Sequence, residues 1–195
     1  MTCIIGFIDK KNKTLHMIGD SLGSNGYTGD TQKNPKICRS KDSDGILLGS
    51  TSTFRQIDIL KYNSFFEEKD ILKKEELNHE YMVTKFIPAL QKVFSKGGIL
   101  IEKSGEKIGG SFLIGTRANL YEIQGDFSVL ENTLPWNALG CGEDFAKASL
   151  FTTKDMELTI KEKLILAISS AEKYSTGVAR PFTYMNTKGE SETID

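Results

Sequence analysis

The short β-like runs of this chain come in groups, and its helical patterns come two at a time. A group of β-like runs opens the chain, two helical patterns follow, and the same arrangement is then repeated before two final β-like runs. A parallel α/β fold would alternate single strands with single helices. The grouping therefore predicts an α+β fold, a four-layer α-β-β-α sandwich of two antiparallel sheets flanked by helices.

The first third of the chain is expected to consist of two hairpins separated by a loop. The expected strands are, in order, Cys3–Asp9, Thr14–Asp20, Pro35–Ser40 and Ile46–Gly49. The polar stretch Lys10–Lys13 forms the first turn, and Asp42–Gly45 forms the second. Between the hairpins, Ser21–Asn34 holds three glycines and almost no large apolar residue, which predicts a loop.

Helical periodicity predicts two helices in the middle of the chain and two near its end. They cover Thr53 to about Phe66, Asn78–Lys96, Asp144–Thr152, and a longer segment that begins at a capping box formed by Thr159 and Glu162. Pro88 should kink or shorten the second helix. The charge run Glu67–Glu76 is expected to be a solvated helix end or loop. The remaining strands are expected at Ile99–Lys103, Ser111–Thr116, Leu120–Gln124, Phe127–Glu131, Phe182–Asn186 and Ser191–Ile194.

Size and charge limit the classes of protein that fit. A chain of 195 residues without repeats or a proline-rich linker is expected to form a single domain over residues 1–195. The 25 Lys and Arg nearly balance the 26 Asp and Glu, which argues against binding to nucleic acid or to an anionic membrane. The longest apolar run, Leu164–Ile168, is far shorter than a membrane span, and we find no secretory leader, so a cytoplasmic location is expected.

Histidine and cysteine are scarce. Cys3, Cys38 and Cys141 form no CxxC pair, which excludes zinc ribbons and thioredoxin-like chemistry. His16 falls in a strand-like run and His79 near a helix start, and each is expected to be an ordinary structural or surface residue. We therefore expect no metal, no cofactor and no histidine-based triad, so a catalytic base must be another group.

Thr2 is the leading candidate for a nucleophile. Methionine aminopeptidases remove an initiator Met that precedes a small residue, which would give Thr2 a hydroxyl and a free α-amine. Such an amine has an unperturbed pKa of about 7.7–8.0 and can act as a base on the neighbouring hydroxyl without a histidine. The strand expected from Cys3 onward would hold Thr2 in place.

Two charged residues are expected beside Thr2. Asp20 ends the strand that pairs with the first one, so an antiparallel hairpin brings it near residue 2. Lys36 opens the next strand. A lysine beside the nucleophile would lower the pKa of its hydroxyl and amine, and Asp20 would hold that lysine in place.

Two short motifs surround these candidates. Thr2–Gly6 reads Thr-Cys-Ile-Ile-Gly, and Met17–Ser21 reads Met-Ile-Gly-Asp-Ser. Asp20 and Lys36 are separated by 36 − 20 = 16 positions. In these motifs and this spacing the chain resembles the N-terminal-nucleophile (Ntn) hydrolases of the proteasome β-subunit and bacterial HslV peptidase family.

Three later segments resemble the same family. Gly45–Thr51 is similar to the segment whose backbone N–H forms the oxyanion hole, and Leu139–Gly142 is similar to the Gly-Ser-Gly turn. Ala167–Ala171 resembles part of the penultimate helix. The resemblance therefore spans nearly the whole chain.

The resemblance implies a role for each candidate residue. Thr2 would be the nucleophile and its own amine the general base, with Lys36 tuning the site and Asp20 orienting Lys36. The backbone N–H of Ser50, or less favourably of Gly49, would stabilise the oxyanion.

The chain departs from the family pattern at two places. Cys141 takes the place of a serine that hydrogen-bonds to the amine, which weakens that bond. The family's Asp-x-x-Ser-Gly segment has no clear match, and Ser175 and Thr176 are the alternative substitutes.

The implied function is a threonine peptidase that acts on peptides or unfolded proteins within a ring-forming homo-oligomer. The chain has no phosphate-binding loop, so an ATP-dependent unfoldase would be a separate partner. Two alternatives stay open. One is a catalytically inactive ring subunit that retains Met1, and the other is a small-molecule amidase, with Cys3 as nucleophile after an extra cleavage.

Overall fold

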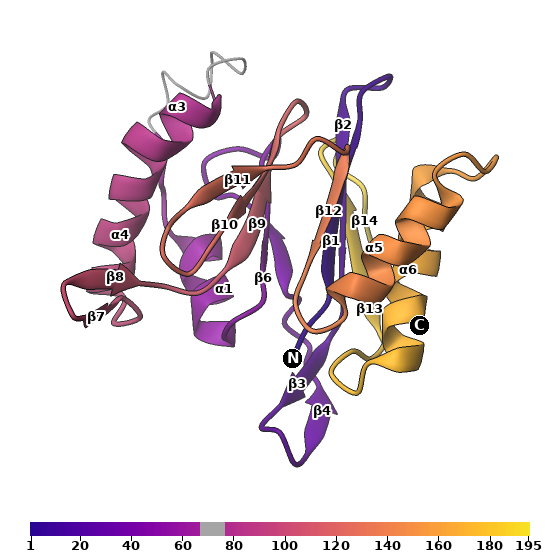
Figure 1. The fold of residues 1–195 in the computed structure, drawn as a ribbon, viewed down its shortest axis with the longest axis horizontal. Coiled ribbons are helices and arrows are strands. Elements are labelled where there is room, and N and C mark those ends of the chain that lie inside the picture. Colours follow the sequence, from indigo (N-terminus) through magenta and orange to yellow (C-terminus); the bar gives the residue numbers. More distant parts are fainter. Residues whose placement is uncertain (67–76) are drawn as a thin grey trace.

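Four layers make up the molecule in the computed structural model, which describes residues 1–66 and 77–195 (Figure 1). Two five-stranded antiparallel sheets face each other, and a layer of helices covers the outer face of each. The α-β-β-α sandwich predicted from the sequence is therefore confirmed. The predicted solvated run Glu67–Glu76 lies outside the described residues.

The first sheet carries both chain termini. In spatial order it consists of β12 (Trp136–Leu139), β1 (Ile4–Asp9), β2 (Thr14–Gly19), β13 (Phe182–Asn186) and β14 (Ser191–Ile194). Its outer face is covered by α5 (Glu143–Thr153) and α6 (Ile160–Tyr174). The predicted capping box is present at the start of α6, where the Thr159 hydroxyl accepts from the Glu162 N–H and the Glu162 carboxylate accepts in return.

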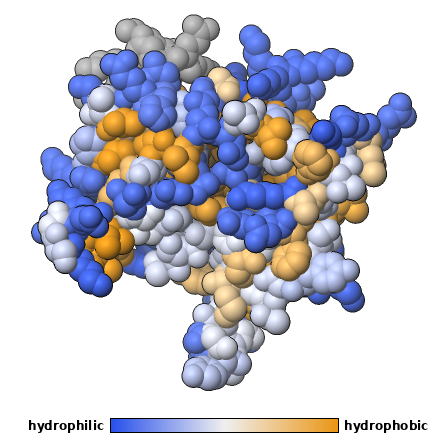
Figure 2. All heavy atoms as spheres, in the orientation of Figure 1, coloured by the Kyte–Doolittle hydropathy of each residue, from blue (hydrophilic) through white to orange (hydrophobic). Residues whose placement is uncertain are grey.

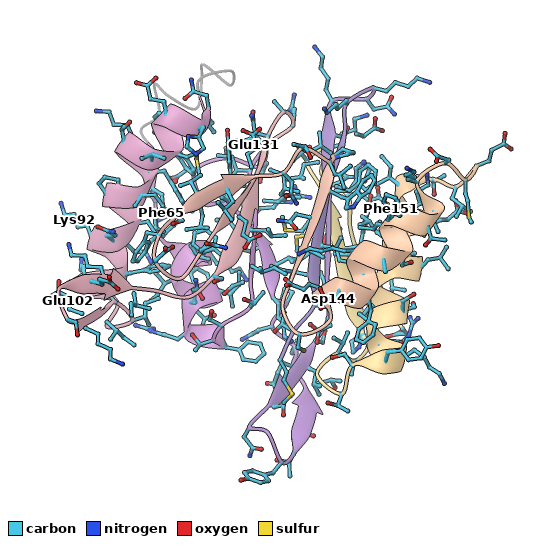
Figure 3. The ribbon with its side chains drawn as sticks, in the orientation of Figure 1. Phe65, Lys92, Glu102, Glu131, Asp144 and Phe151 are labelled. Carbon is cyan, nitrogen blue, oxygen red and sulfur yellow. The ribbon has the colours of Figure 1, made fainter. Side chains whose placement is uncertain are left out.

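The second sheet is built from the middle of the chain. In spatial order it consists of β11 (Val129–Glu131), β10 (Leu120–Ile123), β9 (Phe112–Gly115), β6 (Leu47–Ser50) and β5 (Ile37–Arg39). The helices α1 (Phe54–Tyr62), α3 (His79–Tyr81) and α4 (Ile87–Lys96), with the π-helical turn η1 (Met82–Phe86), lie on its outer side. Phe65 belongs to the core between these helices and the sheet (Figure 3).

Three apolar cores separate the four layers, and β1 contributes to two of them. Ile4 and Ile8 belong to the core between the sheets, whereas Cys3 and Ile5 belong to the core under α5 and α6. Strands covered on both faces are apolar on both faces, which explains why the opening of the chain reads as a nearly continuous apolar run. Gly6 permits close packing of the sheets, because a Cβ there would lie 2.9 Å from Leu120 Cδ1.

The structure corrects the prediction for Ser21–Asn34. This segment is not a plain loop, because β3 (Leu22–Ser24) and β4 (Gly29–Thr31) pair within it. The hairpin stands clear of the body beside the N-terminus, as Figures 1 and 2 show. Its residues are half-buried or exposed, so it lacks the apolar alternation by which strands are predicted.

Other differences concern short elements and ends. The strand β12 was not predicted, and a second exposed hairpin pairs β7 (Ile101–Lys103) with β8 (Glu106–Ile108). The first helix ends at Tyr62 and not near Phe66. Pro88 falls in the first turn of α4, directly after the π-helical turn η1. The distortion predicted at Pro88 is therefore a change from π-helical to α-helical hydrogen bonding.

Candidate active site

Thr2 lies just before β1, and the hairpin register places Asp20 next to this end of the strand. Ile4 pairs with Gly19, so Cys3 lies opposite Asp20. The Cys3 N–H donates to Asp20 Oδ1 at 2.9 Å, and the Asp20 N–H donates to the Cys3 carbonyl at 3.2 Å. Thr2 is only 3% exposed. The hairpin therefore fixes both residues, as the sequence predicted.

Asp20 and Lys36 form a buried ion pair. Lys36 Nζ lies 2.9 Å from each Asp20 carboxylate oxygen, and the two residues are 4% and 1% exposed. The Leu22 N–H also donates to Asp20 Oδ2, at 3.0 Å. Burial raises the pKa of the Asp20 carboxyl, and the ammonium of Lys36 and the two backbone N–H groups oppose that rise.

Lys36 also reaches the peptide bond that precedes Thr2. Its Nζ donates to the Met1 carbonyl oxygen at 3.2 Å. The Thr2 hydroxyl donates to the same oxygen. The hydroxyl of Thr2 and the ammonium of Lys36 thus donate to one carbonyl oxygen, and together they polarise the peptide bond that precedes Thr2.

Cys141 contacts the nitrogen that would become the free amine. The Thr2 N–H donates to Cys141 Sγ at 3.2 Å. The Ser175 hydroxyl donates to the same sulfur at 3.4 Å, while Thr176 is exposed. Of the two alternatives considered for the missing family segment, Ser175 is therefore the one that the structure brings to Cys141.

The turn between β12 and α5 fits closely around Thr2. Gly140 has a φ of +106°, and a Cβ there would lie 2.3 Å from the Thr2 carbonyl oxygen. The Gly142 N–H donates to that oxygen at 3.3 Å. Glycine is required at position 140 both by its backbone conformation and by this close approach.

Ser50 and Gly49, the two residues assigned to the oxyanion, lie in β6. The Ser50 N–H donates to the Lys36 carbonyl oxygen at 2.9 Å, so it is already engaged in the sheet. A Cβ on Gly49 would lie 3.0 Å from Ile4 Cδ1, which places Gly49 at the core between the sheets. Neither backbone N–H is shown to be free for a substrate, because neighbouring strands pair on both sides of β6.

A cavity of about 270 Å³ adjoins these residues. Its wall includes Met1 and Thr2, which precede β1, Lys36, which precedes β5, and residues from β6, from the first turn of α1 and from β3. Leu22 and Ser24 of β3 were missed as candidates, because their only sequence signal is their position just after Asp20. A larger cavity of about 460 Å³ lies toward the opposite end of β1, where Lys10 and Arg117 line it.

Cys3 does not fit the role of a nucleophile. Its side chain is fully buried in the core under α5 and α6. Burial raises the pKa of its thiol, and the charge of Asp20 raises it further. A buried thiol that resists ionisation is a poor nucleophile, so the structure disfavours the alternative built on Cys3.

Residues 1–66 and 77–195 contain no group of three or more His, Cys, Asp or Glu side chains that could hold a metal ion. None of the helices in this part of the chain is both long and apolar enough to cross a bilayer.

The four-layer sandwich of two antiparallel sheets defines the class as the Ntn-hydrolase fold. No family model and no curated protein matches the sequence. Solved structures match over the whole chain. BPH from Thiobacillus denitrificans, in complex with epoxomicin, is 13% identical, with a TM-score of 0.69 and 100% of both chains covered.

Two further structures narrow the fold type. Eukaryotic HslV from Trypanosoma brucei is 18% identical, with a TM-score of 0.65 and 95% of this chain and 98% of that chain covered. Anbu, an ancestral β-subunit, from Yersinia bercovieri is 13% identical, with a TM-score of 0.65 and 100% and 87% covered. The chain therefore has the HslV and proteasome type of Ntn-hydrolase fold.

Proposed function

We propose that this chain is a threonine peptidase of the HslV and proteasome β-subunit type, active once the Met1–Thr2 bond is cleaved. The observation that carries the proposal is the convergence of three groups on that bond. Lys36 Nζ lies 3.2 Å from the Met1 carbonyl oxygen, Cys141 Sγ lies 3.2 Å from the Thr2 nitrogen, and the Thr2 hydroxyl contacts the same carbonyl.

Each group has a defined part in the proposed reaction. The α-amine of Thr2 takes the proton from the Thr2 hydroxyl as Oγ1 attacks the carbonyl carbon of a substrate peptide bond. Lys36 favours the developing alkoxide, and Asp20 holds Lys36 in place. The C–N bond then breaks, the leaving amine takes the proton from the α-ammonium, and water hydrolyses the ester on Thr2.

Cys141 and Ser175 would position the amine. The sulfur accepts from the Thr2 nitrogen and also from the Ser175 hydroxyl. The family uses a hydroxyl where this chain has a thiol, and sulfur is a weaker acceptor. Cys141, supported by Ser175, therefore positions the amine through a hydrogen bond that is weaker than one to a serine hydroxyl.

The proposed substrates and partners follow from the resemblance to the HslV and proteasome β-subunit family. We expect peptides or unfolded proteins as substrates, a ring-forming homo-oligomer, and a separate ATP-dependent unfoldase as a partner. The cytoplasmic location stays a prediction.

Intact mass and two variants test the proposal. We expect the active protein to have lost Met1, and Thr2→Ala to lower the kcat/KM for an unstructured peptide by at least about 10³-fold. Cys3→Ala should retain hydrolysis. A protein that keeps Met1 and hydrolyses no peptide would favour the structural ring subunit, and loss of activity in Cys3→Ala alone would favour the amidase alternative.

A further inference from the structure

The Ser50 side chain is a buried hydroxyl without a hydrogen-bond partner. Within the described residues, Ser50 Oγ and Gln56 Oε1 are the buried side-chain oxygen or nitrogen atoms that lack one. Ser50 is 4% exposed. Buried polar groups are nearly always hydrogen-bonded, so a lone hydroxyl of this kind indicates a partner that enters from outside the chain.

Ser50 lies where such a partner would meet the nucleophile. It lines the cavity of about 270 Å³ together with Thr2 and Lys36. Its backbone N–H donates to the Lys36 carbonyl at 2.9 Å, which fixes Ser50 next to the lysine that precedes β5. The other unpartnered atom belongs to Gln56, whose amide nitrogen is already held by the Gly110 carbonyl at 2.7 Å.

The N-terminal turn of α1 adds a positive electrostatic potential to the same cavity. Thr53, the N-cap, and Phe54 both line it, and the first turn contains no acidic residue. The N-terminus of a nine-residue helix carries a partial positive charge, which stabilises a nearby anion. Negative charge that develops beside Ser50 is therefore favoured by the helix as well as by Lys36.

At Ser50 the side-chain hydroxyl is free to donate a hydrogen bond, whereas the nearby main-chain N–H groups are already engaged. The Ser50 N–H is engaged by Lys36, and the next N–H, that of Thr51, donates to the Ser111 carbonyl at 3.4 Å. The Ser50 hydroxyl has one hydrogen to donate and can rotate to meet an acceptor.

We propose that the Ser50 hydroxyl donates a hydrogen bond to the carbonyl oxygen of the scissile bond and stabilises its oxyanion. The inference rests on the proposed function. As Thr2 Oγ1 bonds to the carbonyl carbon, the π electrons of the carbonyl move to its oxygen, and Ser50 Oγ–H donates to that oxygen without transferring its proton. When the C–N bond breaks, the carbonyl re-forms and the hydrogen bond weakens.

Ser50→Ala, made in protein whose intact mass shows that Met1 is absent, tests this role. We expect the kcat for a fluorogenic peptide to fall by about 10²- to 10³-fold, with a much smaller change in KM. The melting temperature should stay the same or rise, because the variant removes an unpaired buried hydroxyl. A structural role would instead lower the melting temperature together with the activity. Ser50→Thr, which keeps the hydroxyl, should recover most of the lost activity.

Ser40→Ala is the matched control. Ser40 is a serine buried to a similar degree, at 5% exposure, and its hydroxyl already accepts from the Asp42 N–H. We expect this variant to lose some stability and to keep its kcat, the opposite pattern to Ser50→Ala.

A β-lactone peptide probe separates the two proposals. Its ring carbonyl is attacked by the Thr2 hydroxyl, the ring C–O bond breaks, and the ester that remains adds the whole mass of the probe. If unsubstituted protein lacking Met1 gains no mass, both the proposed function and the role of Ser50 are overturned. If it gains mass and Ser50→Ala gains it at the same rate, the role of Ser50 alone is overturned.

Discussion

At the scale of single residues, the buried pair of Asp20 and Lys36 links the folding of the chain to its proposed chemistry. Asp20 accepts from two backbone N–H groups as well as from Lys36, so its carboxylate is fully engaged. An ion pair buried this deeply contributes little net stability, because desolvation offsets attraction. Its presence agrees with the proposed mechanism, in which Lys36 supplies a cation beside Thr2.

Lys36→Met is expected to lower both stability and activity. Removing one partner leaves a buried carboxylate uncompensated, which typically costs about 3–5 kcal/mol of unfolding free energy. Loss of the cation should lower the kcat/KM for a peptide by at least about 10²-fold. Urea unfolding and peptide hydrolysis measure the two effects.

A second variant and a control separate the effects. Lys36→Met combined with Asp20→Asn should regain part of the stability and none of the activity. Lys41→Met, at an exposed position, should change the unfolding free energy by no more than about 0.5 kcal/mol. If Lys36→Met is as stable as the unsubstituted protein, the expected loss of unfolding free energy from an unpaired Asp20 is contradicted.

At the scale of elements, the site depends on strands that meet from distant parts of the chain. The strand β1 pairs with β2 on one side and with β12 on the other, and β13 adds to the far side of β2. His16 of β2 lies opposite Asn186 of β13. The His16 Nδ1 lies 2.6 Å from the Tyr184 hydroxyl, so this half-buried ring helps to join the two strands.

The stability of this strand pair should depend on pH through His16. Burial lowers the pKa of His16, the charges of Asp9 and Glu190 oppose that effect, and the charge of Lys188 adds to it. Below the ordinary histidine pKa of about 6.5, the unfolded chain binds a proton that the folded chain does not. Unfolding free energy is therefore lost as the pH falls through that value toward the lower folded pKa.

His16→Gln should weaken this dependence. Between about pH 7.5 and pH 5.5, the unsubstituted protein is expected to lose more unfolding free energy than the variant, as measured by urea unfolding at each pH. Parallel curves for the two proteins would show that His16 does not titrate differently in the folded and unfolded states.

At the scale of the whole molecule, the helices α5 and α6 and the connection between them leave apolar side chains in solvent. Phe151, Met156 and Leu166 are 57%, 50% and 45% exposed, and Figure 3 shows α5 in the outer layer between Asp144 and Phe151. Exposed apolar side chains on an outer layer are compatible with the proposed assembly of several copies.

The proposed ring predicts the mass of the native protein. Light scattering should give a single species whose mass is a multiple of 21.7 kDa. The mass should stay the same over a tenfold dilution, because a closed assembly does not depend on weak, open-ended association. A species of 21.7 kDa at both concentrations would contradict the ring.

Much of the fold and part of the site could be predicted from the sequence, because they depend on local patterns. The hairpin that brings Asp20 to the start of β1 follows from two apolar runs and a polar turn. The start of α6 follows from the capping box at Thr159. Asp20 ends one expected strand and Lys36 opens the next, and the expectation that Asp20 holds Lys36 is confirmed by their ion pair.

Contacts between distant segments were decided by the tertiary structure. Two examples are the pairing of β12 with β1 and the contact of Ser175 with Cys141. These residues are far apart in the sequence, and no local hydrophobic pattern predicts that they meet. The same holds for Ser50, because its N–H is satisfied by a neighbouring strand while its hydroxyl is left unpaired. Local propensity and hydrophobic spacing determine which segments become strands and helices, whereas the hydrogen-bond partner of each group is set only when the layers pack together.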